Sequence, residues 1–471
     1  MRSIKSFLIE VQKRAFARVD IASLVFFRIV FGGLLVWDSY RYFFFDRIPN
    51  CWILPRLLFK YYGFSWVQPW PGNGMYIHWA VLGLLAFFIA IGFLYRASII
   101  LYCLGYTYTF LLDEGTWVNH TYLICLVSFL MIFAPAHRAF SVDAWLRPKL
   151  RSQTTPAWTL WLLRAQMGVV YFFSGVAKLS PDWLHGEPLR TWLPKLPVPA
   201  IIRGIGAEWT VYCFSYTGLL LDLFVVPLLL WRRTRVAAFC VALVFHLLNA
   251  HFFFIGIFPW LAIAGTTLFF SPSWPRRVLS IFGVRIPAAR EADQPQPGPL
   301  AQAAVMAFVA IYVAIQVLVP LRPFLYRGGV EWVSAEHRFC WRMMLLDEWI
   351  RANFYVVDPN SGEEFHVKPE DYLLSWQIRR MGWRPDMLVQ FAQYLAKVMP
   401  RSGPKPLRVE ARIFVSLNGR APQLFIDQNV DLAAEERPLG RPKWLLEIHE
   451  PLPAHATRES ENPFIDKVDE N

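Results

Sequence analysis

The sequence predicts an α-helical polytopic membrane bundle of about nine transmembrane helices, followed by a C-terminal exoplasmic α+β domain. Three observations predict it. Only 17% of the 471 residues are charged and 55% are hydrophobic, whereas soluble domains carry about 25% charged residues. A series of apolar runs approaches the roughly 20 residues that cross a bilayer. After Pro323, strand-like alternation replaces these runs and charged residues become common.

The elements begin with a basic, amphipathic segment, residues 1–20, which has no apolar core of its own. No cleavable signal peptide is evident, so we expect the first span to act as the targeting signal. Several of the spans that follow are short. In chain order they are Ile21–Trp37, Tyr76–Phe93, Ile99–Leu112, His120–Phe133, Trp158–Val176, Tyr212–Trp231, Val236–Ala250, Phe254–Phe270 and Ala301–Leu321.

The part after the last span has a different periodicity. Tyr355–His366 and Arg408–Phe425 alternate like strands, and Met387–Met399 is typical of an amphipathic helix. A loop rich in Pro and Gln, Gln294–Gly298, precedes the last span. We therefore divide the chain into a cytoplasmic N-terminus (1–20), a transmembrane bundle (21–321), an exoplasmic α+β domain (322–450) and a disordered tail (451–471).

The orientation follows from five basic segments: the N-terminus, Tyr95–Arg96, Arg138–Arg151, Arg232–Arg235 and Arg276–Arg290. They lie before the first span and after every second span, so all five can lie in the cytoplasm together. With nine spans the C-terminal domain is then outside. The net charge of +12 does not indicate nucleic acid, because the basic residues cluster in short loops beside apolar runs. The predicted partner is the lipid bilayer.

Four of the six cysteines lie in predicted spans and are most simply small apolar residues. Cys51 and Cys340 are both predicted outside, where disulfides persist. A bridge between them is open, but a sequence cannot place their Cα atoms.

Three ionisable residues lie within predicted spans: Arg28, Arg164 and Asp222. Ionisable groups in hydrocarbon are costly, and they mark either function or buried pairing. We favour a buried Arg–Asp pair that fixes helix packing, and direct contact with a ligand is the alternative.

A second group of polar residues comes from three helices and converges at one predicted membrane depth. Its members are Asn119 and His120 at the start of the fourth span, Lys178 at the end of the fifth, and His246, Asn249 and His251 in and after the seventh. A single lysine at the end of a span usually reaches to the interface. The convergence favours a site, because a lysine withdrawn from water can act as a neutral base. Histidine and asparagine can hydrogen-bond an anion formed beside it.

This group does not have the pattern of a metal site. His246 and His251 are five residues apart, off the i, i+4 spacing of two ligands on one helical face. No HExxH motif, Walker loop, GxGxxG or GxSxG occurs in the sequence. We therefore predict no metal ligands.

At these residues the sequence resembles the vitamin K-dependent γ-glutamyl carboxylases, a group of HTTM-domain membrane proteins. The resemblance covers residues 20–450, and its most specific blocks are GVAKLSPDW and WVNH. The matching segments are Tyr106–Leu126, Leu163–Trp183, Leu219–Phe224 (LLLDLF), Phe245–Trp260 (FHLLNAHFFFIGIFPW), Cys340–Met344 (CWRMM), Val415–Arg420 (VSLNGR) and Phe425–Leu432 (FIDQNVDL).

The resemblance implies a fold with a cytosolic N-terminus and an exoplasmic C-terminal domain, as loop charge predicts independently. It implies an enzyme that oxygenates reduced vitamin K to the epoxide, with O₂ and CO₂ as co-substrates. The strong base so generated removes a γ-proton from a protein glutamate, which then takes up CO₂ to give γ-carboxyglutamate. The implied partner is a glutamate-containing protein or peptide.

The family's residues fall on matching positions of this chain. The catalytic lysine falls on Lys178, the histidine that assists the hydroquinone on His120 with Asn119 adjacent, and the seventh-span histidine on His246. We expect Asn249, His251, Arg28 and Arg164 to contact the vitamin K hydroquinone, and Arg384 and Trp341 to contact the glutamate substrate.

The chain also departs from the family. Ala177 precedes Lys178 where animal members carry a second lysine, and Arg384-Pro385 replaces a histidine ahead of Asp386-Met387-Leu388. The second change falls in the segment that the resemblance implies handles the glutamate substrate. The family's loop-to-domain disulfide has no cysteine at one of its positions, although Cys51 and Cys340 lie in the same two segments. The chain ends at residue 471 without the large β-rich extension of animal enzymes, and such a short form looks bacterial.

Two function classes therefore remain. The first is a vitamin K-dependent carboxylase and epoxidase, in the inner or plasma membrane of a bacterium. The second is a quinone- or lipid-binding membrane protein that does not carboxylate. Lys178 and His120 favour the first, because a binding module has no need of a base withdrawn from water. A transporter would show inverted repeats or paired half-helices, and the sequence has neither.

Overall fold

The computed structural model describes residues 2–196, 207–253, 255–284, 296–325, 338–438, 440–447 and 449–452. The chain divides into two compact units. The first unit contains Met1–Leu54, Lys60–Val176 and Leu220–Leu321. The second contains Pro55–Phe59, Ala177–Leu219 and Arg322–Asn471. The segment that begins with Ala177 and Lys178 thus belongs with the C-terminal residues. The predicted tail lies almost wholly outside the described residues.

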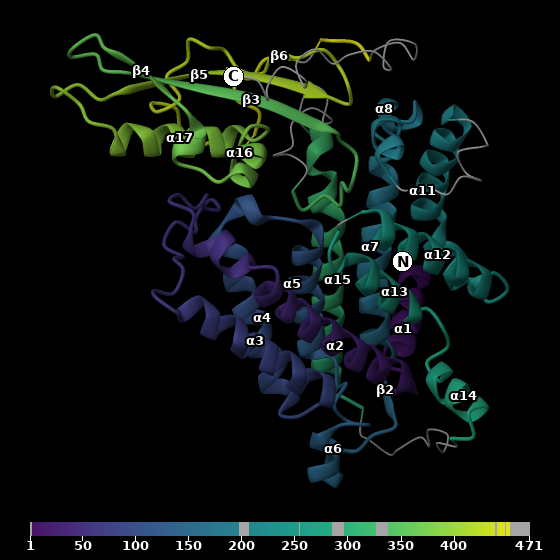
Figure 1. Ribbon diagram of the computed structural model, residues 1–471. Helices are drawn as coiled ribbons and strands as arrows, with labels where there is room; N and C mark the ends of the chain where they lie inside the picture. The colour runs from purple at the N-terminus through teal and green to yellow at the C-terminus, as the bar shows by residue number, and fades with distance from the viewer. Residues whose placement is uncertain are drawn as a thin grey trace. The chain divides into compact units, whose positions relative to one another are not determined.

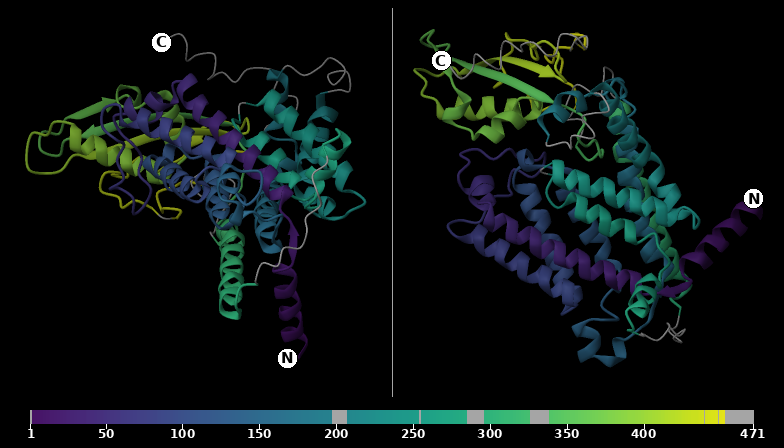
Figure 2. Two further views of the ribbon diagram at one scale, coloured as in Figure 1. Left: turned by 90° about the horizontal axis from the view of Figure 1, so that it is seen from below. Right: turned by 45° about the vertical axis from the view of Figure 1, so that its right-hand side comes forward.

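The first unit is a bundle of apolar helices (Figure 1). Helices α2, α3, α4 and α5 lie beside one another in that view, and α1 extends away from the other helices in both further views (Figure 2). The helices are α1 (Arg2–Ala15), α2 (Ala22–Phe44), α3 (Gly74–Ile91), α4 (Tyr95–Leu112), α5 (Asn119–Phe133), α6 (Val142–Leu146), α7 (Ala157–Ala177), α11 (Ala207–Leu230), α12 (Arg235–Phe252), α13 (Phe258–Thr267), α14 (Trp274–Ile281) and α15 (Pro299–Leu321); α7 and α11 each run into the second unit.

Six helices in the described part of the chain are long and apolar enough to cross a membrane. They are α2, α3, α7, α11, α12 and α15. The three remaining predicted spans also form helices, α4, α5 and α13. Of these, α5 has 15 residues and α13 has 10, which is short of the roughly 20 that a perpendicular crossing takes. The helical membrane bundle is confirmed with six candidate spans.

Small residues let the helices approach closely. A Cβ atom on Gly32 of α2 would lie 2.5 Å from the backbone nitrogen of Ala90 in α3. A Cβ on Gly175 of α7 would lie 2.9 Å from the backbone nitrogen of Leu223 in α11. Membrane helices gain stability from such close van der Waals packing, because lipid supplies no hydrophobic force between them. These glycines therefore set the spacing of α2 with α3 and of α7 with α11.

Four of the five predicted cytoplasmic segments have contacts at one end of the bundle. Strand β1 (Arg18–Asp20) pairs antiparallel with β2 (Thr154–Pro156). Arg276 forms an ion pair with Asp20, with Nε 2.8 Å from Oδ2. The carboxylate of Asp143 accepts the backbone N–H groups of Leu94 and Tyr95, each at 2.9 Å. Figure 1 shows β2, α6 and α14 at this same end.

The second unit contains a four-stranded antiparallel sheet in the order β4-β3-β5-β6. Helices α16 and α17 lie along one face of it (Figure 1). The predicted strand Tyr355–His366 is in fact parts of two strands joined by a turn, and Arg408–Phe425 likewise contains two strands. The elements are β3 (Glu348–Val357), β4 (Glu364–Val367), α16 (Ser375–Met381), α17 (Pro385–Val398), β5 (Arg408–Leu417) and β6 (Gln423–Leu424).

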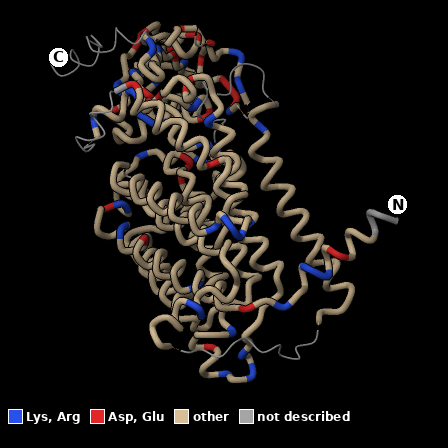
Figure 3. The backbone as a smooth tube through the Cα atoms, turned by 90° about the vertical axis from the view of Figure 1, so that its right-hand side faces the viewer, with Lys and Arg blue, Asp and Glu red and all other residues tan. Residues whose placement is uncertain are grey.

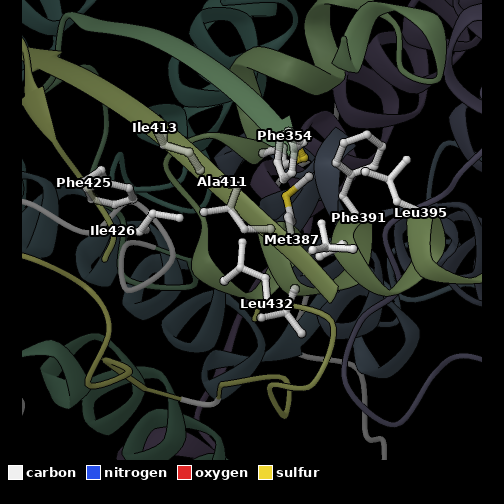
Figure 4. Packing of buried hydrophobic residues seen from close by; sticks show 14 of the residues in the cluster. Phe354, Met387, Phe391, Leu395, Ala411, Ile413, Phe425, Ile426 and Leu432 are labelled. Atoms are coloured by element: carbon white, nitrogen blue, oxygen red, sulfur yellow. The ribbon is translucent and has the colours of Figure 1, made fainter. Parts of the chain in front are cut away.

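A closed hydrophobic core joins the sheet to α17 (Figure 4). Phe354 of β3 and Phe391 of α17 pack edge to face with ring centroids 4.9 Å apart, and both are 0% exposed. Charged residues are frequent in this unit, whereas the bundle helices are largely uncharged (Figure 3). The predicted C-terminal α+β domain is confirmed.

Neither Cys51 nor Cys340 is part of a disulfide in this structure. The Sγ atom of Cys340 lies 3.2 Å from the carbonyl oxygen of Arg338. Burial raises the pKa of the Cys51 thiol to about 12, so that thiol stays protonated at neutral pH. The bridge that the sequence left open is not formed.

Candidate functional site

The first group of buried polar residues joins α7 to α12. The hydroxyl of Tyr171 lies 2.6 Å from Nε2 of His246, and the two residues are 3% and 2% exposed. Nδ1 of His246 is buried and has no hydrogen-bond partner among the described residues. A buried ring nitrogen without a partner is costly. It is therefore available for a ligand.

A carboxylate lies one turn further along α7, on the neighbouring helix α11. Ser174 of α7 donates its hydroxyl to Oδ2 of Asp222 in α11 at 2.7 Å. Both residues are buried. The Tyr171–Ser174 spacing of three places the two side chains on one face of α7. Lys178 continues that i, i+3, i+7 spacing in the sequence.

The second group surrounds His120 at the start of α5. A Cβ atom on Gly256 would lie 3.3 Å from Nε2 of His120 and 3.2 Å from Nη1 of Arg41. Gly256 has φ +64, a conformation that other L residues adopt with strain. Arg41 pairs with Asp38 at 3.3 Å. The hydroxyl of Tyr106 donates to the second oxygen of Asp38 at 3.4 Å.

The segment that begins at Gly256 connects the two groups. Gly256 lies against His120, and two residues later the ring of Phe258 contacts His246 with centroids 6.2 Å apart. Both histidines therefore contact one short segment of the first unit. This segment belongs to the FHLLNAHFFFIGIFPW block.

Three neighbours of these histidines have different environments. Asn119 is half-buried beside His120 at the start of α5. Asn249 turns back to its own helix and donates Nδ2 to the carbonyl oxygen of Phe245 at 3.0 Å. His251 is exposed and packs on the ring of Phe252. Asn249 and His251 thus have local contacts that require no ligand.

Lys178 follows the last residue of α7 and belongs to the second unit. It is 6% exposed, and its Nζ atom lies 5.2 Å from the centre of the Trp183 ring. A Cβ atom on Gly218 of α11 would lie 3.9 Å from Cε of Lys178 and 3.4 Å from the Trp183 ring. The glycine leaves room for the lysine stem and the indole together. The result is a lysine largely withdrawn from water.

The two arginines within the bundle correct one prediction. Arg28 is 0% exposed and donates to the carbonyl oxygens of Ala136, at 2.9 Å, and of Phe140. Arg164 donates to those of Leu268, at 2.7 Å, and Phe270, at 3.1 Å. The predicted Arg–Asp pair with Asp222 is therefore wrong. A guanidinium has five donors, and loop carbonyls at a helix end can accept them. Both arginines tie loops to the bundle.

Arg384 and Trp341 lie inside the second unit. Arg384 is 2% exposed and is the N-cap residue of α17, with Nη1 3.8 Å from the sulfur of Met387. Trp341 is 0% exposed and has φ 58, in the left-handed region. Direct contact of either side chain with a peptide requires this part of the unit to open.

Sequence reasoning missed Asp38, Arg41 and Tyr171. The first span was predicted to end at Trp37, but α2 continues to Phe44, so Asp38 and Arg41 lie on a buried helix. Opposite charges three residues apart directly after an apolar run could have indicated them. For Tyr171 the signal was its spacing from Ser174 and Lys178.

No group of three or more His, Cys, Asp or Glu residues in the described part of the chain could hold a metal ion. The buried polar groups described above include histidine ring nitrogens, a tyrosine hydroxyl and a lysine amine, and such groups carry out proton transfer. The fold and these residues define a polytopic membrane protein with buried acid–base groups.

Comparison with known families identifies the chain further. Residues 16–274 match the family described as HTTM domain, and residues 301–451 match the vitamin K-dependent gamma-carboxylase, lumenal domain. The chain belongs to the vitamin K-dependent gamma-carboxylase family. No solved structure matches it.

Proposed function

We propose that this protein oxygenates reduced vitamin K to its epoxide and couples that reaction to deprotonation and carboxylation of glutamate side chains. Family membership supports this proposal, and the observation that carries it is Lys178. Most lysines are exposed, but Lys178 is 6% exposed and its amine lies against an indole ring. Burial of this kind is typical of an amine that gives up or takes a proton in a reaction.

The environment of the histidines fits a hydroquinone substrate. A hydroquinone presents hydroxyl groups that need hydrogen-bond partners when they leave water. His246 has a buried ring nitrogen with no partner among the described residues. The lack of a side chain at Gly256 lets His120 and Arg41 come close to this backbone segment, because a Cβ there would lie only 3.2–3.3 Å from both groups. When bound, reduced vitamin K would supply the reducing equivalents, and its oxygenation by O₂ would generate the strong base of the proposed reaction.

The roles of the chain's own residues follow from their chemistry. Lys178 would accept a proton from the bound hydroquinone. His120 and His246 would orient it through their ring nitrogens, and Tyr171 would hold the ring of His246 in place through the 2.6 Å contact at Nε2. Arg41, paired with Asp38, would stabilise negative charge that develops beside His120.

We also propose nine spans, a cytoplasmic N-terminus and an exoplasmic C-terminal unit. The meeting of basic segments at one end of the bundle supports this orientation, because cytoplasmic loops are rich in Lys and Arg. A reporter that is active only in the cytoplasm, fused after Asn471, should be inactive. Activity of that fusion would reverse the topology.

The reaction is tested by supplying reduced vitamin K, labelled bicarbonate and a glutamate peptide to the purified full-length protein. The epoxide and γ-carboxyglutamate are then measured separately. We expect Lys178→Ala to abolish epoxide formation and small exogenous amines to restore it partly. Lys195→Ala is the matched control, because Lys195 is an exposed lysine in the same connection between α7 and α11, and it should retain activity.

Two results would contradict the proposal. Full epoxidation by Lys178→Ala without added amine would remove Lys178 from the mechanism. Binding of vitamin K by the wild type without any epoxide would favour the alternative, a quinone-binding protein without carboxylase activity.

A further inference from the structure

A buried carboxylate fixes the segment that follows Lys178. The two oxygens of Asp182 accept hydrogen bonds from Nη1 and Nη2 of Arg420 at 2.7 and 2.8 Å, and one of them also accepts Nδ2 of Asn418 at 2.7 Å. Asp182 and Arg420 are each 6% exposed. All three residues belong to the second unit. A two-pronged guanidinium–carboxylate contact of this kind is short and directional.

The donors of this contact are themselves held in place. Asn418 and Gly419 form the turn after β5 with φ 52 and φ 77. Oδ1 of Asn418 accepts the backbone N–H of Asp347 at 2.8 Å. Nε of Arg420 donates to the carbonyl oxygen of Glu450 at 3.0 Å. The guanidinium therefore has a fixed position before it meets Asp182.

Asp182, which accepts these hydrogen bonds, is adjacent in sequence to Trp183, whose ring lies against Lys178. Asp182 and Trp183 are neighbours in the short helix α8 (Pro181–Leu184). Nε1 of Trp183 donates to the carbonyl oxygen of Ser215 at 2.9 Å, and the hydroxyl of Ser215 donates to the carbonyl oxygen of Trp183 at 2.6 Å. Any shift of α8 moves the indole ring that lies 5.2 Å from Nζ of Lys178.

We infer that Arg420, assisted by Asn418, is a positioning residue that fixes Lys178 through Asp182 and Trp183. Its catalytic meaning rests on the proposed function, but the geometric link does not. Arg420 is far along the chain from Lys178, and its guanidinium acts on the lysine through two intervening residues. Loss of Arg420 should therefore lower kcat for epoxidation and leave the KM for reduced vitamin K unchanged.

The direct test measures access to Lys178 and needs no activity. The purified full-length protein is treated with a small amine-reactive acylating reagent, and the labelling rate of Lys178 is followed by peptide mass spectrometry. In Arg420→Gln we expect this rate to rise on the order of tenfold, as for the loss of coupling between contacting residues. Exposed Lys405 is the internal reference, and its rate should not change.

Two further variants keep the test decisive. Arg408→Gln removes an exposed ion pair with Glu410, 2.9 Å apart in β5, and is the matched control that should leave Lys178 protected. If Arg420→Gln does not fold, the double variant Asp182→Asn, Arg420→Gln removes both charges and leaves no unpaired buried ion. It should still show faster labelling of Lys178.

The outcomes separate this inference from the proposed function. Wild-type labelling rates at Lys178 in the variants that fold would overturn the inference, whatever happens to epoxidation. The variants could show faster labelling while the wild type forms no epoxide. That result would support the positioning role and refute the proposed function.

Discussion

The hydroxyl of Tyr171 in α7 lies 2.6 Å from Nε2 of His246 in α12, and both residues are buried. The contact orients the imidazole so that Nδ1, which has no partner among the described residues, is the nitrogen left for a ligand. A tyrosine hydroxyl can donate or accept. The contact therefore fixes the orientation of the imidazole ring in either tautomer of His246.

Tyr171→Phe tests this relationship. The change removes the hydrogen bond at Nε2 and leaves a buried ring nitrogen unsatisfied, which should lower the free energy of unfolding by about 1–3 kcal/mol. Epoxide formation should fall as well, because the imidazole loses its orientation. Unfolding in detergent and the rate of epoxide formation measure the two effects.

Tyr312→Phe is the matched control for that variant. Tyr312 of α15 donates to Oε1 of Gln166 in α7 at 2.7 Å, so its loss removes a comparable buried bond elsewhere in the bundle. We expect a similar loss of stability with epoxidation retained. Equal loss of activity in both variants would mean that Tyr171 acts through stability alone.

Gly256→Ala should impair epoxidation more than it impairs folding. The new Cβ would meet Nε2 of His120 at 3.3 Å and Nη1 of Arg41 at 3.2 Å, so both groups must shift. Strain at φ +64 should cost about 1 kcal/mol. Gly72→Ala carries comparable strain at φ +57 with nothing within 4 Å of its Cβ. Epoxidation by Gly72→Ala should match the wild type, and equal loss in the two variants would exclude a role for the Gly256 contact.

Arg384→Ala separates the two chemical steps. The proposed epoxidation needs Lys178, His120, reduced vitamin K and O₂, whereas carboxylation also needs a glutamate within reach. If Arg384 pairs with the substrate carboxylate, the variant should raise the KM for peptide and leave epoxidation untouched. Because Arg384 is 2% exposed, the unfolding temperature of the variant must be measured together with its kinetics. Parallel loss of epoxidation, carboxylation and stability would make Arg384 structural.

Acid should destabilise the bundle through His137, which lies in the loop after α5. Burial and, to a smaller extent, nearby Arg96 lower the pKa of His137 to about 4. The unfolded chain binds its proton near pH 6.5, so the stability contributed by neutral His137 is complete above that pH. It is lost as the pH falls toward 4, by up to about 3 kcal/mol.

His137→Phe should remove this component of the acid sensitivity and keep the packing on the Tyr95 ring, whose centroid is 5.2 Å away. Unfolding midpoints of the wild type and the variant should converge or cross between pH 7 and 4. Substitution of the exposed His366 should not alter the pH dependence. Parallel pH profiles for wild type and His137→Phe would show that His137 does not contribute.

Much of the fold could be predicted, because lipid and water impose periodicities that a sequence must show. Apolar length located α2, α7 and α15, and two-residue alternation located β5 but only the C-terminal end of β3. The prediction was less accurate where the length of the apolar run differs from the length of the helix. α2 continues seven residues beyond Trp37 through Asp38 and Arg41, because a buried ion pair lets charged residues stay in a helix. The short α13 depends on tertiary packing, which no local pattern encodes.

The site residues named from the sequence are of two kinds. His120, His246 and Lys178 could be named as candidates because polar groups inside or at the ends of apolar segments are rare. Arg28 and Arg164 satisfied the same rule, but loop carbonyls accept their hydrogen bonds. Their partners are backbone atoms more than a hundred residues away in the chain. Pairing with backbone leaves no trace in side-chain composition.

The contact between Asp20 and Arg276 has a consequence for synthesis of the protein. Asp20 directly precedes α2, yet its ion-pair partner is about 256 residues later in the chain. At about 5–20 residues per second, the ribosome needs roughly 10–50 s to cover that distance. Helix α2 thus enters the bilayer long before the ion pair between Asp20 and Arg276 can form. Insertion of α2 and formation of this ion pair are separate events in time, and a nascent chain stalled before Arg276 lacks the ion pair at its basic end.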